Sequence, residues 1–439
     1  MPTPARRSRA VPTASARPPA APDRVPPEAL PPEVAARFAA ALDALAPGGR
    51  LALAVSGGAD SLALLLLADG WTRAAPDRRL YVLTVDHGLR PESARETGAV
   101  AAQATALGHD HAVLRPNRPL PRRGLEAAAR ACRYELMAAW CRAAAVPALA
   151  TGHTLDDQAE TLLMRLERGS GLDGLSAMAP ETRLGDIRLL RPLLGFRRAE
   201  TAALVARAGL HAADDPMNHD PAFERVRIRR AMTTLGLDAE GLAATADRLR
   251  RDRAAIETLV DDLVRRAFTL SPAGVGGIEV AALRGTPAPL VERALARLIR
   301  AVGGGAYPPR RDRLDRLAAL IAGDGDFPGA TLGGCRFLPG RGHVRVLREA
   351  RRLGPDLELG AGAAGVWDGR FAVVAGAQPV TIAALGAHRP QGLPALPAAE
   401  RQVLPAVFSQ GRLIAVPTLE FGTPQAARLR YCAPSMFSA

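Results

Sequence analysis

The most specific chemical signal in the sequence is a short polar segment, residues 56–61, which reads Ser-Gly-Gly-Ala-Asp-Ser. It follows an apolar run, 51–55, that predicts a buried strand, and it precedes an apolar segment, 61–68, that predicts a helix. Adjacent glycines let a backbone turn with its N–H groups pointing inward, and a helix N-terminus adds positive potential. This pattern predicts a phosphate-binding loop formed by Ser56, Gly57, Gly58, Ala59, Asp60 and Ser61.

This loop is not a Walker loop, because it lacks the G-x-x-x-x-G-K-[ST] spacing and the chain contains no lysine. It resembles the S-G-G-x-D-S loop of the PP-loop ATP pyrophosphatases, a family that cleaves ATP between the α and β phosphates and adenylates a substrate. The resemblance implies ATP as a substrate and Mg²⁺ as its counterion. Asp60 would then lie where a Mg²⁺ ion that bridges the phosphates needs a carboxylate.

Two further polar clusters also follow predicted strands. Residues 86–90 follow a strand expected at 81–85, and residues 152–160 follow a short strand tip at 148–151. In a doubly wound parallel sheet, ligands bind beyond the carboxyl ends of the strands, so we expect the three clusters to share one edge. The candidate residues in these two clusters are Asp86, His87, His153, Asp156, Asp157 and Glu160.

The third cluster has both a functional and a purely structural explanation. Thr154 can cap a helix whose first turn carries Asp156 and Asp157, and helical spacing brings His153 and Glu160 toward the same face. Carboxylates in a first turn also stabilise the helix dipole without any catalytic role. Dipole compensation does not require a histidine among several acid and amide groups, so the run as a whole favours function.

The second and third clusters resemble the tRNA(Ile)-lysidine synthetase family, whose D-H-G-L-R and G-H-x-x-D-D-Q-A-E-T segments match residues 86–90 and 152–161. The resemblance is close over about residues 50–230. This chain departs from the family pattern at two positions. Val226 stands where the family has Asn, and Met217 stands where it usually has Ser, so these departures affect local hydrogen bonds. Further pieces that resemble the family, at 130–134, 191–194, 215–218 and 223–229, supply candidate substrate and tRNA contacts: Arg133, Arg191, Asn218, Phe223, Arg225, Arg227 and Arg229.

The resemblance implies a two-step reaction. ATP adenylates O2 of the wobble cytidine in an isoleucine tRNA with a CAU anticodon, and diphosphate leaves. The ε-amine of free L-lysine then attacks C2 and expels AMP, which leaves lysidine. Family members are often dimeric, so the resemblance also implies a homodimer.

Roles for individual residues follow from the same resemblance. The expected catalytic residues are Asp60, Arg130, His153, Asp156 and Asp157. Asp86 and His87 are expected to bind ATP together with the loop, and Glu160 to bind a substrate. The sequence leaves open which acid is the general base, the lysine anchor or the metal ligand among Asp86, Asp156, Asp157 and Glu160.

Composition agrees with an RNA partner without selecting one. The 439 residues include Lys+Arg 57 and Asp+Glu 44, for a net charge of +13, and such an excess favours phosphate-rich partners. A high-GC genome also raises the arginine content, and we attribute the missing lysine to that. The alternatives are another PP-loop tRNA-modifying enzyme of the thiolase type and a non-catalytic, arginine-rich RNA-binding protein. Cys132 and Cys141 are not the paired cysteines typical of a cytidine thiolase, and the intact loop disfavours a pure binding protein.

The order of elements predicts an α/β fold with a doubly wound, mostly parallel sheet, then a helical region and a small β-rich C-terminal domain. A helical pattern is expected over 236–302, and residues 360–365 are expected to form a linker. The four cysteines are widely spaced with no C-x-x-C pair, which fits a reducing cytoplasm. The longest apolar run, 62–68, is far shorter than the about 20 residues of a membrane span, so we expect a soluble protein. The expected divisions are a disordered Pro/Ala/Arg-rich tail at 1–32, a PP-loop catalytic domain at 33–235, a mainly helical tRNA-binding or linker domain at 236–358, and a β-rich domain at 366–439.

Overall fold

The computed structural model describes residues 30–88, 93–117, 119, 121, 125–213, 220–305, 307–323, 325–434 and 436. The expected disordered tail, apart from residues 30–32, therefore lies outside the described residues, and so do Met217 and Asn218. The chain forms two compact units that divide between Arg253 and Ala254. The four divisions expected from the sequence stay predictions.

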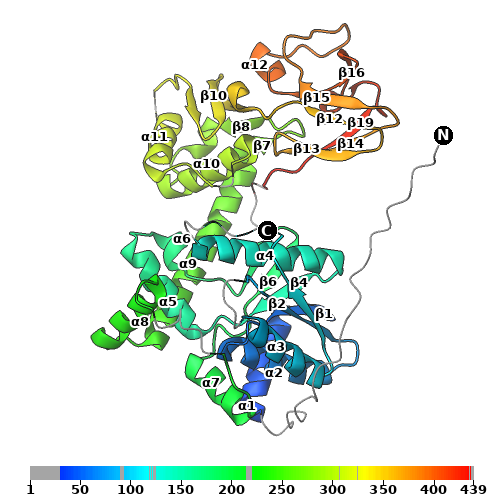
Figure 1. Ribbon diagram of the computed structural model, residues 1–439. Coiled ribbons are helices and arrows are strands. Elements are labelled where there is room, and N and C mark those ends of the chain that lie inside the picture. The colour runs from blue at the N-terminus through cyan, green and yellow to red at the C-terminus, as the bar shows by residue number, and fades with distance from the viewer. Residues whose placement is uncertain are drawn as a thin grey trace, which may run out of the picture. The chain divides into compact units, whose positions relative to one another are not determined.

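A six-stranded sheet forms the centre of the first unit (Figure 1), with the order β3-β2-β1-β4-β6-β5. All neighbours are parallel except β5, which is antiparallel to β6 at one edge. This sheet confirms the predicted doubly wound, mostly parallel α/β fold. Its strands are β1 (Arg50–Ala54), β2 (Arg79–Val85), β3 (Asp110–Leu114), β4 (Ala148–Thr151), β5 (Glu181–Leu184) and β6 (Ile187–Leu190).

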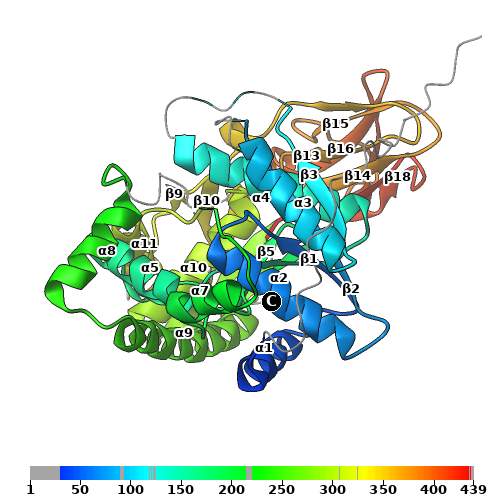
Figure 2. The ribbon, with the colours of Figure 1, turned by 60° about the horizontal axis from the view of Figure 1, so that its bottom comes forward.

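Helices cover both faces of this sheet, as Figures 1 and 2 show. Along β1, Leu51 and Leu53 join one apolar core, whereas Ala52 joins another, because successive side chains of a strand point to opposite faces. The core on the first face includes α1, α2 and α7, and the core on the second face includes α4. The helices are α1 (Pro32–Ala44), α2 (Ala59–Arg73), α3 (Ser93–Ala106), α4 (Leu125–Ala143), α5 (Leu155–Glu167), α6 (Leu172–Leu175), α7 (Arg198–Arg207) and α8 (Glu224–Leu235).

The strand β3 was not predicted from the sequence. It lies at the edge of the sheet, and each of its residues stays at least partly exposed. An edge strand therefore lacks the continuous apolar run that identified β1 and β2. The expected helices at 92–107 and 124–145 are present as α3 and α4.

The second unit combines helices with three antiparallel sheets, of order β7-β8-β11-β10-β9, β12-β15-β16-β17-β18 and β13-β14-β19. Its helices are α10 (Ala288–Gly303), α11 (Arg311–Ala322), α12 (Ala398–Arg401) and the C-terminal part of α9 (Ala239–Ala267), which crosses the division. Its strands are β7 (Phe268–Leu270), β8 (Gly276–Glu279), β9 (Ala330–Leu332), β10 (Cys335–Pro339), β11 (His343–Arg348), β12 (Leu357–Leu359), β13 (Ala364–Trp367), β14 (Phe371–Ala375), β15 (Val380–Ala384), β16 (Pro405–Ser409), β17 (Arg412–Val416), β18 (Phe421–Gly422) and β19 (Ala427–Tyr431).

Two expectations for this region were wrong. The helical pattern over 236–302 is interrupted by the β7–β8 hairpin, whose Gly-rich segment around 274–277 is a poor helix former. Residues 360–365 are not a linker between domains: 360–363 form the turn that joins β12 to β13, where the Gly362 N–H donates to the Gly376 carbonyl at 2.8 Å, and 364–365 already belong to β13.

Among the described residues, every helix falls short of the length and apolarity that crossing a membrane requires.

Candidate active site

The loop after β1 has the geometry of an anion-binding turn. Gly57 adopts φ +91°, which favours glycine, and Gly58 is the extended N-cap of α2. The Ser61 hydroxyl donates to the Gly58 carbonyl at 2.8 Å and accepts from the Ser56 N–H at 3.1 Å. Ser61 therefore closes the loop, and the first N–H groups of α2 have no partner within the helix.

Glycine at position 152 lets the end of β4 approach this loop. A Cβ atom on Gly152 would lie 2.9 Å from the Asp60 carbonyl oxygen and 3.1 Å from the Ser61 nitrogen. Both contacts are to backbone, which cannot move away as a flexible side chain would. The third polar cluster thus begins in direct contact with the first turn of α2, as the sequence predicts for clusters at neighbouring strand ends.

The Asp86 carboxylate accepts hydrogen bonds from residues close to it in the fold. Its Oδ1 accepts from the Gly88 N–H and the Ser93 hydroxyl, each at 2.9 Å, and its Oδ2 accepts from Arg115 Nε at 3.1 Å. These contacts, led by the Gly88 hydrogen bond, lower the pKa of the Asp86 carboxyl, so it stays ionised. Asp86 is only 7% exposed and shapes the turn that carries His87.

His87 has unmet hydrogen-bonding capacity. Both ring nitrogens are buried, and neither has a hydrogen-bond partner among the residues that the structure describes. Burial, reinforced by the charge of Arg133, lowers the pKa of His87, so the ring is neutral at pH 7. A neutral imidazole offers one donor and one acceptor, which suits a polar ligand.

The first turn of α5 is built by a capping box. The Thr154 N–H donates to Asp157 Oδ2 at 2.8 Å, and the Thr154 hydroxyl donates to the same oxygen at 3.1 Å. Asp156 Oδ2 accepts from the backbone N–H of Arg198 at 2.7 Å. One oxygen of each aspartate therefore has a structural role. The other oxygen of Asp157 accepts hydrogen bonds from arginines.

Buried acids and arginines meet where α5 packs against α8 and where Arg198, at the start of α7, contacts the first turns of α5 (Figures 1 and 2). Asp157 Oδ1 accepts from Arg198 Nη2 at 3.0 Å and from Arg225 Nη1 at 3.1 Å. Glu160 Oε1 accepts from Arg198 Nη1 at 3.0 Å and from Arg229 Nε at 2.6 Å. With Asp60 included, we call this group the carboxylate–arginine cluster; its members are Asp60, Asp157, Glu160, Arg198, Arg225 and Arg229.

Asp60 joins the cluster from the phosphate loop. The Thr201 hydroxyl donates to Asp60 Oδ1, and Arg198 Nε lies 3.5 Å from Asp60 Oδ2. Burial raises the pKa of the Asp60 carboxyl, while the hydrogen bond from Thr201 and the charge of Arg198 act in the opposite direction. One arginine therefore contacts acids from both the phosphate loop and α5.

His153 lies next to this cluster. Its Nδ1 is 2.8 Å from the Thr151 hydroxyl oxygen. Burial lowers the pKa of His153 to about 4, although the nearby charge of Asp157 opposes this effect. His153 is therefore uncharged at pH 7 and can act there as a hydrogen-bonding group.

The remaining candidates lie in different settings. Arg191 is 8% exposed and donates to the Ala179 carbonyl and the Thr182 hydroxyl, which are contacts within its own sheet region. Arg130 and Arg133 are exposed on α4, where the Arg130 guanidinium lies 5.2 Å from the centre of the Tyr134 ring.

The segment around α8 separates into buried and exposed residues. Phe223 is the N-cap of α8, and Arg227 donates to the carbonyls of Pro221 and Ala222. Val226, one of the two departures from the family pattern, is 6% exposed, and Asn218 lies outside the described residues. Of the predicted RNA-contacting arginines on α8, Arg225 and Arg229 pair with buried acids instead of standing free.

Sequence reasoning missed Arg198 and Thr201. Both lie in the first turn of α7, far along the chain from the loops that they contact. The available signal was weak, because an arginine and a threonine at a helix start are ordinary residues there. Only the packing of α7 against α2 brings them to Asp60.

The residues at the loop fit a Mg²⁺ ion that is bound together with a nucleotide. No group of three or more potential metal-ligating side chains occurs among the described residues, so they offer no all-protein metal cage. Mg²⁺ usually binds through one or two carboxylates plus substrate phosphates. Asp60, in the first turn of α2 beside the loop N–H groups, provides such a carboxylate.

Comparisons with known proteins agree with this geometry. Residues 31–235 match the model of the PP-loop domain family. The chain is 41% identical to the tRNA(Ile)-lysidine synthase of Hyphomonas neptunium, over 73% of this chain and 88% of that protein. It is 45% identical to the protein of the same name from Bradyrhizobium sp. strain BTAi1, over 65% of this chain and 85% of that protein.

A third relative, the tRNA(Ile)-lysidine synthase of Ruegeria pomeroyi, is 38% identical over 74% of this chain and 76% of that protein. A solved U34-tRNA thiolase from Methanococcus maripaludis is similar over 51% of this chain, but 18% identity and a TM-score of 0.45 are too low to bear on function. Because the curated matches cover most of each relative at 38–45% identity, this chain belongs to the tRNA(Ile)-lysidine synthase family and carries its PP-loop domain.

Proposed function

We propose that this protein is an ATP-dependent ligase that adenylates the wobble cytidine of tRNA(Ile) with a CAU anticodon and joins L-lysine to its C2. The products are lysidine, AMP and diphosphate. The observation that carries the proposal is the meeting of the phosphate loop with a buried acidic cluster at one edge of the sheet. Family membership supports the ATP-dependent, tRNA-modifying class, and we propose a cytoplasmic location for the reaction.

In the first step, the loop holds the phosphates of ATP. The N–H groups at the start of α2 and the Ser56 and Ser61 hydroxyls donate to phosphate oxygens, which absorbs charge as diphosphate leaves. Asp60 would hold the Mg²⁺ ion, which when bound neutralises phosphate charge. Asp86 keeps the His87 turn in shape, and we assign the unmet ring nitrogens of His87 to the bound nucleotide.

In the second step, an ammonium group must be bound and deprotonated. The ε-ammonium of lysine has an ordinary pKa near 10.4, so it needs a carboxylate to attract it and a base to take its proton. We propose that Asp156, which accepts one backbone N–H and forms no ion pair among the described residues, supplies the negative charge, while arginines hold Asp157 and Glu160 in place behind it. His153, neutral at pH 7, donates or accepts a hydrogen bond at the base or the α-phosphate, and Arg130 orients the same group.

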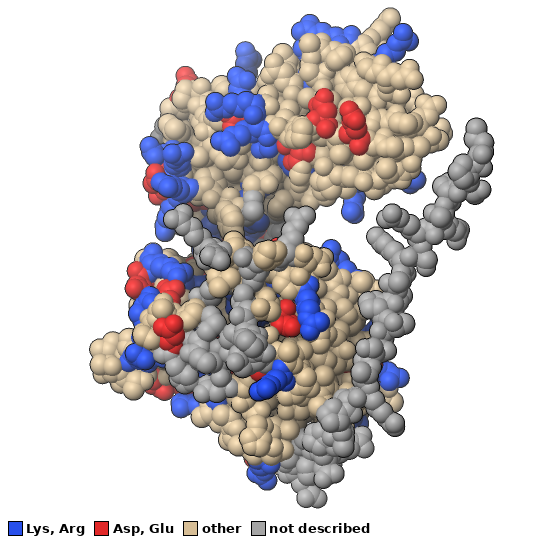
Figure 3. Space-filling view, viewed as in Figure 1, with Lys and Arg blue, Asp and Glu red and all other residues tan. Residues whose placement is uncertain are grey.

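The tRNA body needs a contact beyond one base, because methionine tRNA also carries CAU. We propose that arginines of both units provide it, with Arg133 and Arg227 in the first unit. Figure 3 shows arginine side chains gathered on the part of the second unit that carries α11 and β10. Such a surface binds RNA phosphates without reading sequence.

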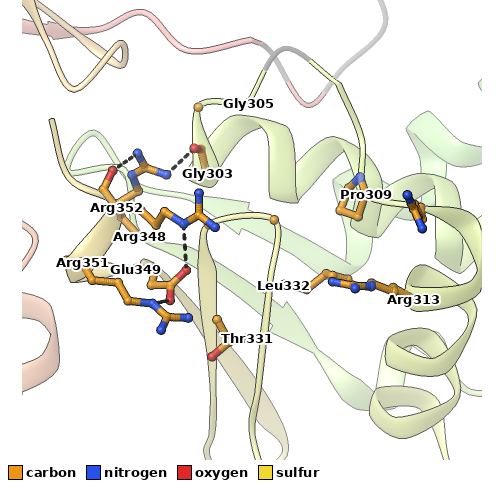
Figure 4. Close-up of a pocket in the computed structure, with 14 residues that line it drawn as sticks. Gly303, Gly305, Pro309, Arg313, Thr331, Leu332, Arg348, Glu349, Arg351 and Arg352 are labelled. Carbon is orange, nitrogen blue, oxygen red and sulfur yellow. Dashed lines mark hydrogen bonds and ion pairs between the residues drawn. The ribbon is translucent and has the colours of Figure 1, made fainter.

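A cavity of about 790 Å³ in the second unit supports this proposal. Its lining contains one acid, Glu349, and a rim of glycines, and Figure 4 shows Arg313 across it from Arg351 and Arg352. The arginines that line it are Arg310, Arg313, Arg348, Arg351 and Arg352.

The decisive experiment follows labelled L-lysine into an isoleucine tRNA transcript with a CAU anticodon, in the presence of ATP and Mg²⁺. We expect label in the RNA and a matching amount of diphosphate, with neither product from the Asp60→Ala variant. Methionine tRNA with the same anticodon is the control for tRNA choice and should stay unlabelled. Diphosphate without lysine incorporation would contradict the choice of nucleophile, and no turnover would favour an RNA-binding protein.

A further inference from the structure

Arg198 stands out because its single guanidinium contacts three carboxylates from two different segments. Its Nη2 donates to Asp157 at 3.0 Å and its Nη1 to Glu160 at 3.0 Å, while its Nε lies 3.5 Å from Asp60. Asp157 and Glu160 belong to α5, whereas Asp60 belongs to the phosphate loop and the first turn of α2. The planar guanidinium, with donors in three directions, suits such a bridge.

The three contacts are unequal. The two to α5 are short, and the Asp157 and Glu160 side chains are only 9% and 1% exposed. The contact to Asp60 is longer, and the Asp60 side chain is 24% exposed. Asp60 is therefore the acid that a diffusing cation can reach, and its link to Arg198 is the one that breaks most easily.

We propose that Arg198 is the resident counterion of Asp60 and is replaced there by the Mg²⁺ ion that arrives with ATP, while it stays bound to Asp157 and Glu160. A metal ion on Asp60 and the Arg198 guanidinium would be close cations that share one carboxylate, so each weakens the other's hold on Asp60. This makes Arg198 a positioning residue that links the metal state of the loop to the acids of α5. The inference rests on the proposed nucleotide site.

The test measures binding instead of turnover. The affinity of α,β-methylene-ATP, which this class of reaction cannot cleave, is determined by calorimetry in EDTA and again in saturating Mg²⁺. The ratio of the two dissociation constants reports how strongly the protein site depends on Mg²⁺. Magnesium binding by the nucleotide itself is the same for every variant and cancels between them.

In Arg198→Gln, Asp60 loses its counterion, so the analogue should bind poorly without Mg²⁺ and recover when Mg²⁺ replaces the missing charge. We expect the ratio to rise by about tenfold relative to wild type, the order expected for one charge in a partly solvated site. An unchanged or smaller ratio overturns the inference, because Arg198 would then be a purely structural residue.

Two further variants keep the test decisive. Arg197→Gln is the matched control, because Arg197 is the neighbouring residue but pairs with Glu240 and Asp238 instead, and it should leave the ratio at the wild-type value. Asp60→Asn should lower the ratio, and adding Arg198→Gln to it should change the ratio no further. A tenfold rise that persists without Asp60 would contradict the proposed exchange.

Arg198→Lys covers the case in which the glutamine variant does not fold. This variant keeps the positive charge, so we expect a ratio within about twofold of wild type. We also expect less incorporation of substrate lysine, because the ammonium group at position 198 cannot bridge both α5 acids as the planar guanidinium does. A tenfold rise in this variant would overturn the charge argument. If the ratio rises in Arg198→Gln but wild type incorporates no lysine, this inference stands and the proposed function fails. If wild type incorporates lysine but the ratio is unchanged in Arg198→Gln, the proposed function stands and this inference fails.

Discussion

The two arginine-rich regions of this protein differ in how their charges are balanced. In the first unit, Arg198, Arg225 and Arg229 each contact a buried carboxylate of Asp157 or Glu160. In the cavity of the second unit, Arg348 pairs with Asp368 and both Arg351 and Arg352 pair with Glu349. The other two lining arginines, Arg310 and Arg313, are exposed and have no acidic partner within ion-pair distance among the described residues.

This difference separates two uses of the same side chain. An arginine that is already paired with a buried acid stabilises that acid in its ionised form and holds it in place. An exposed, unpaired arginine keeps its hydrogen-bonding capacity for an external anion such as an RNA phosphate. Net charge alone cannot distinguish the two, because both uses contribute the same positive count.

The largest effect on folding is expected from Glu160→Gln. Glu160 is 1% exposed and pairs with Arg198 and Arg229, so removing its charge leaves Arg229 without its carboxylate partner and takes one of three carboxylates from Arg198. We expect a loss of about 3–5 kcal/mol in the free energy of unfolding, measured in urea. Glu240→Gln, which breaks an exposed pair with Arg197, is the control and should change little. Equal effects in the two variants would remove the distinction between buried and exposed pairs.

Asp60→Asn should affect catalysis more than folding. The amide keeps the shape of the side chain but loses the charge that holds Mg²⁺ near the departing diphosphate. We expect lysine incorporation to fall by about 10²–10³-fold, the range found when one electrostatic contact to a transition state is removed. Circular dichroism and the urea midpoint should stay close to wild type. If unfolding of the variant accounts for the whole loss of lysine incorporation, Asp60 is needed for folding and not for catalysis.

The stability of the first unit should depend on pH through His153, which lies beside the carboxylate–arginine cluster. The arginines contribute no such dependence, because their charges do not change between pH 4 and 8. The pKa of His153 is lowered to about 4 in the folded protein from an ordinary value of 6.5, so the unfolded chain binds the proton first. The stability associated with neutral His153 is complete above about pH 6.5 and is lost as the pH falls toward 4. We expect His153→Gln to lose about 1–2 kcal/mol less than wild type over that range, measured by urea unfolding. Parallel pH profiles would count against a buried, neutral His153.

The smallest effect is expected in the cavity of the second unit. Replacing Arg310 and Arg313 together by Gln should weaken tRNA binding by about tenfold and reduce its salt dependence by about one unit per lost phosphate contact. Filter binding at several salt concentrations measures both quantities. Arg265→Gln is the matched control, because Arg265 is exposed but paired with Asp262. If the control weakens binding as much, unpaired and paired arginines do not differ as the comparison requires.

Much of the fold could be predicted because its strong signals are local. The apolar runs of β1 and β2, and the loop at 56–61 between a strand and a helix, are properties of neighbouring residues. The edge strand β3 and the β7–β8 hairpin escaped prediction because part-exposed strands carry no continuous apolar run. The turn at 360–363 was predicted to be part of a linker, because closely spaced glycines occur in both tight turns and linkers.

The candidate site divides in the same way. The sequence by itself determined the phosphate loop, the polar residues at the strand ends and the acidic first turn of α5, since each depends on spacing within a few residues. Only the tertiary structure decided that Arg225 and Arg229 face Glu160 and that Arg198 and Thr201 meet Asp60. These contacts join residues that are distant in the chain, and they exist because α7 packs on α2 and α8 packs on α5. A buried charge without a partner is energetically costly, so the acids enclosed by this packing are paired with arginines.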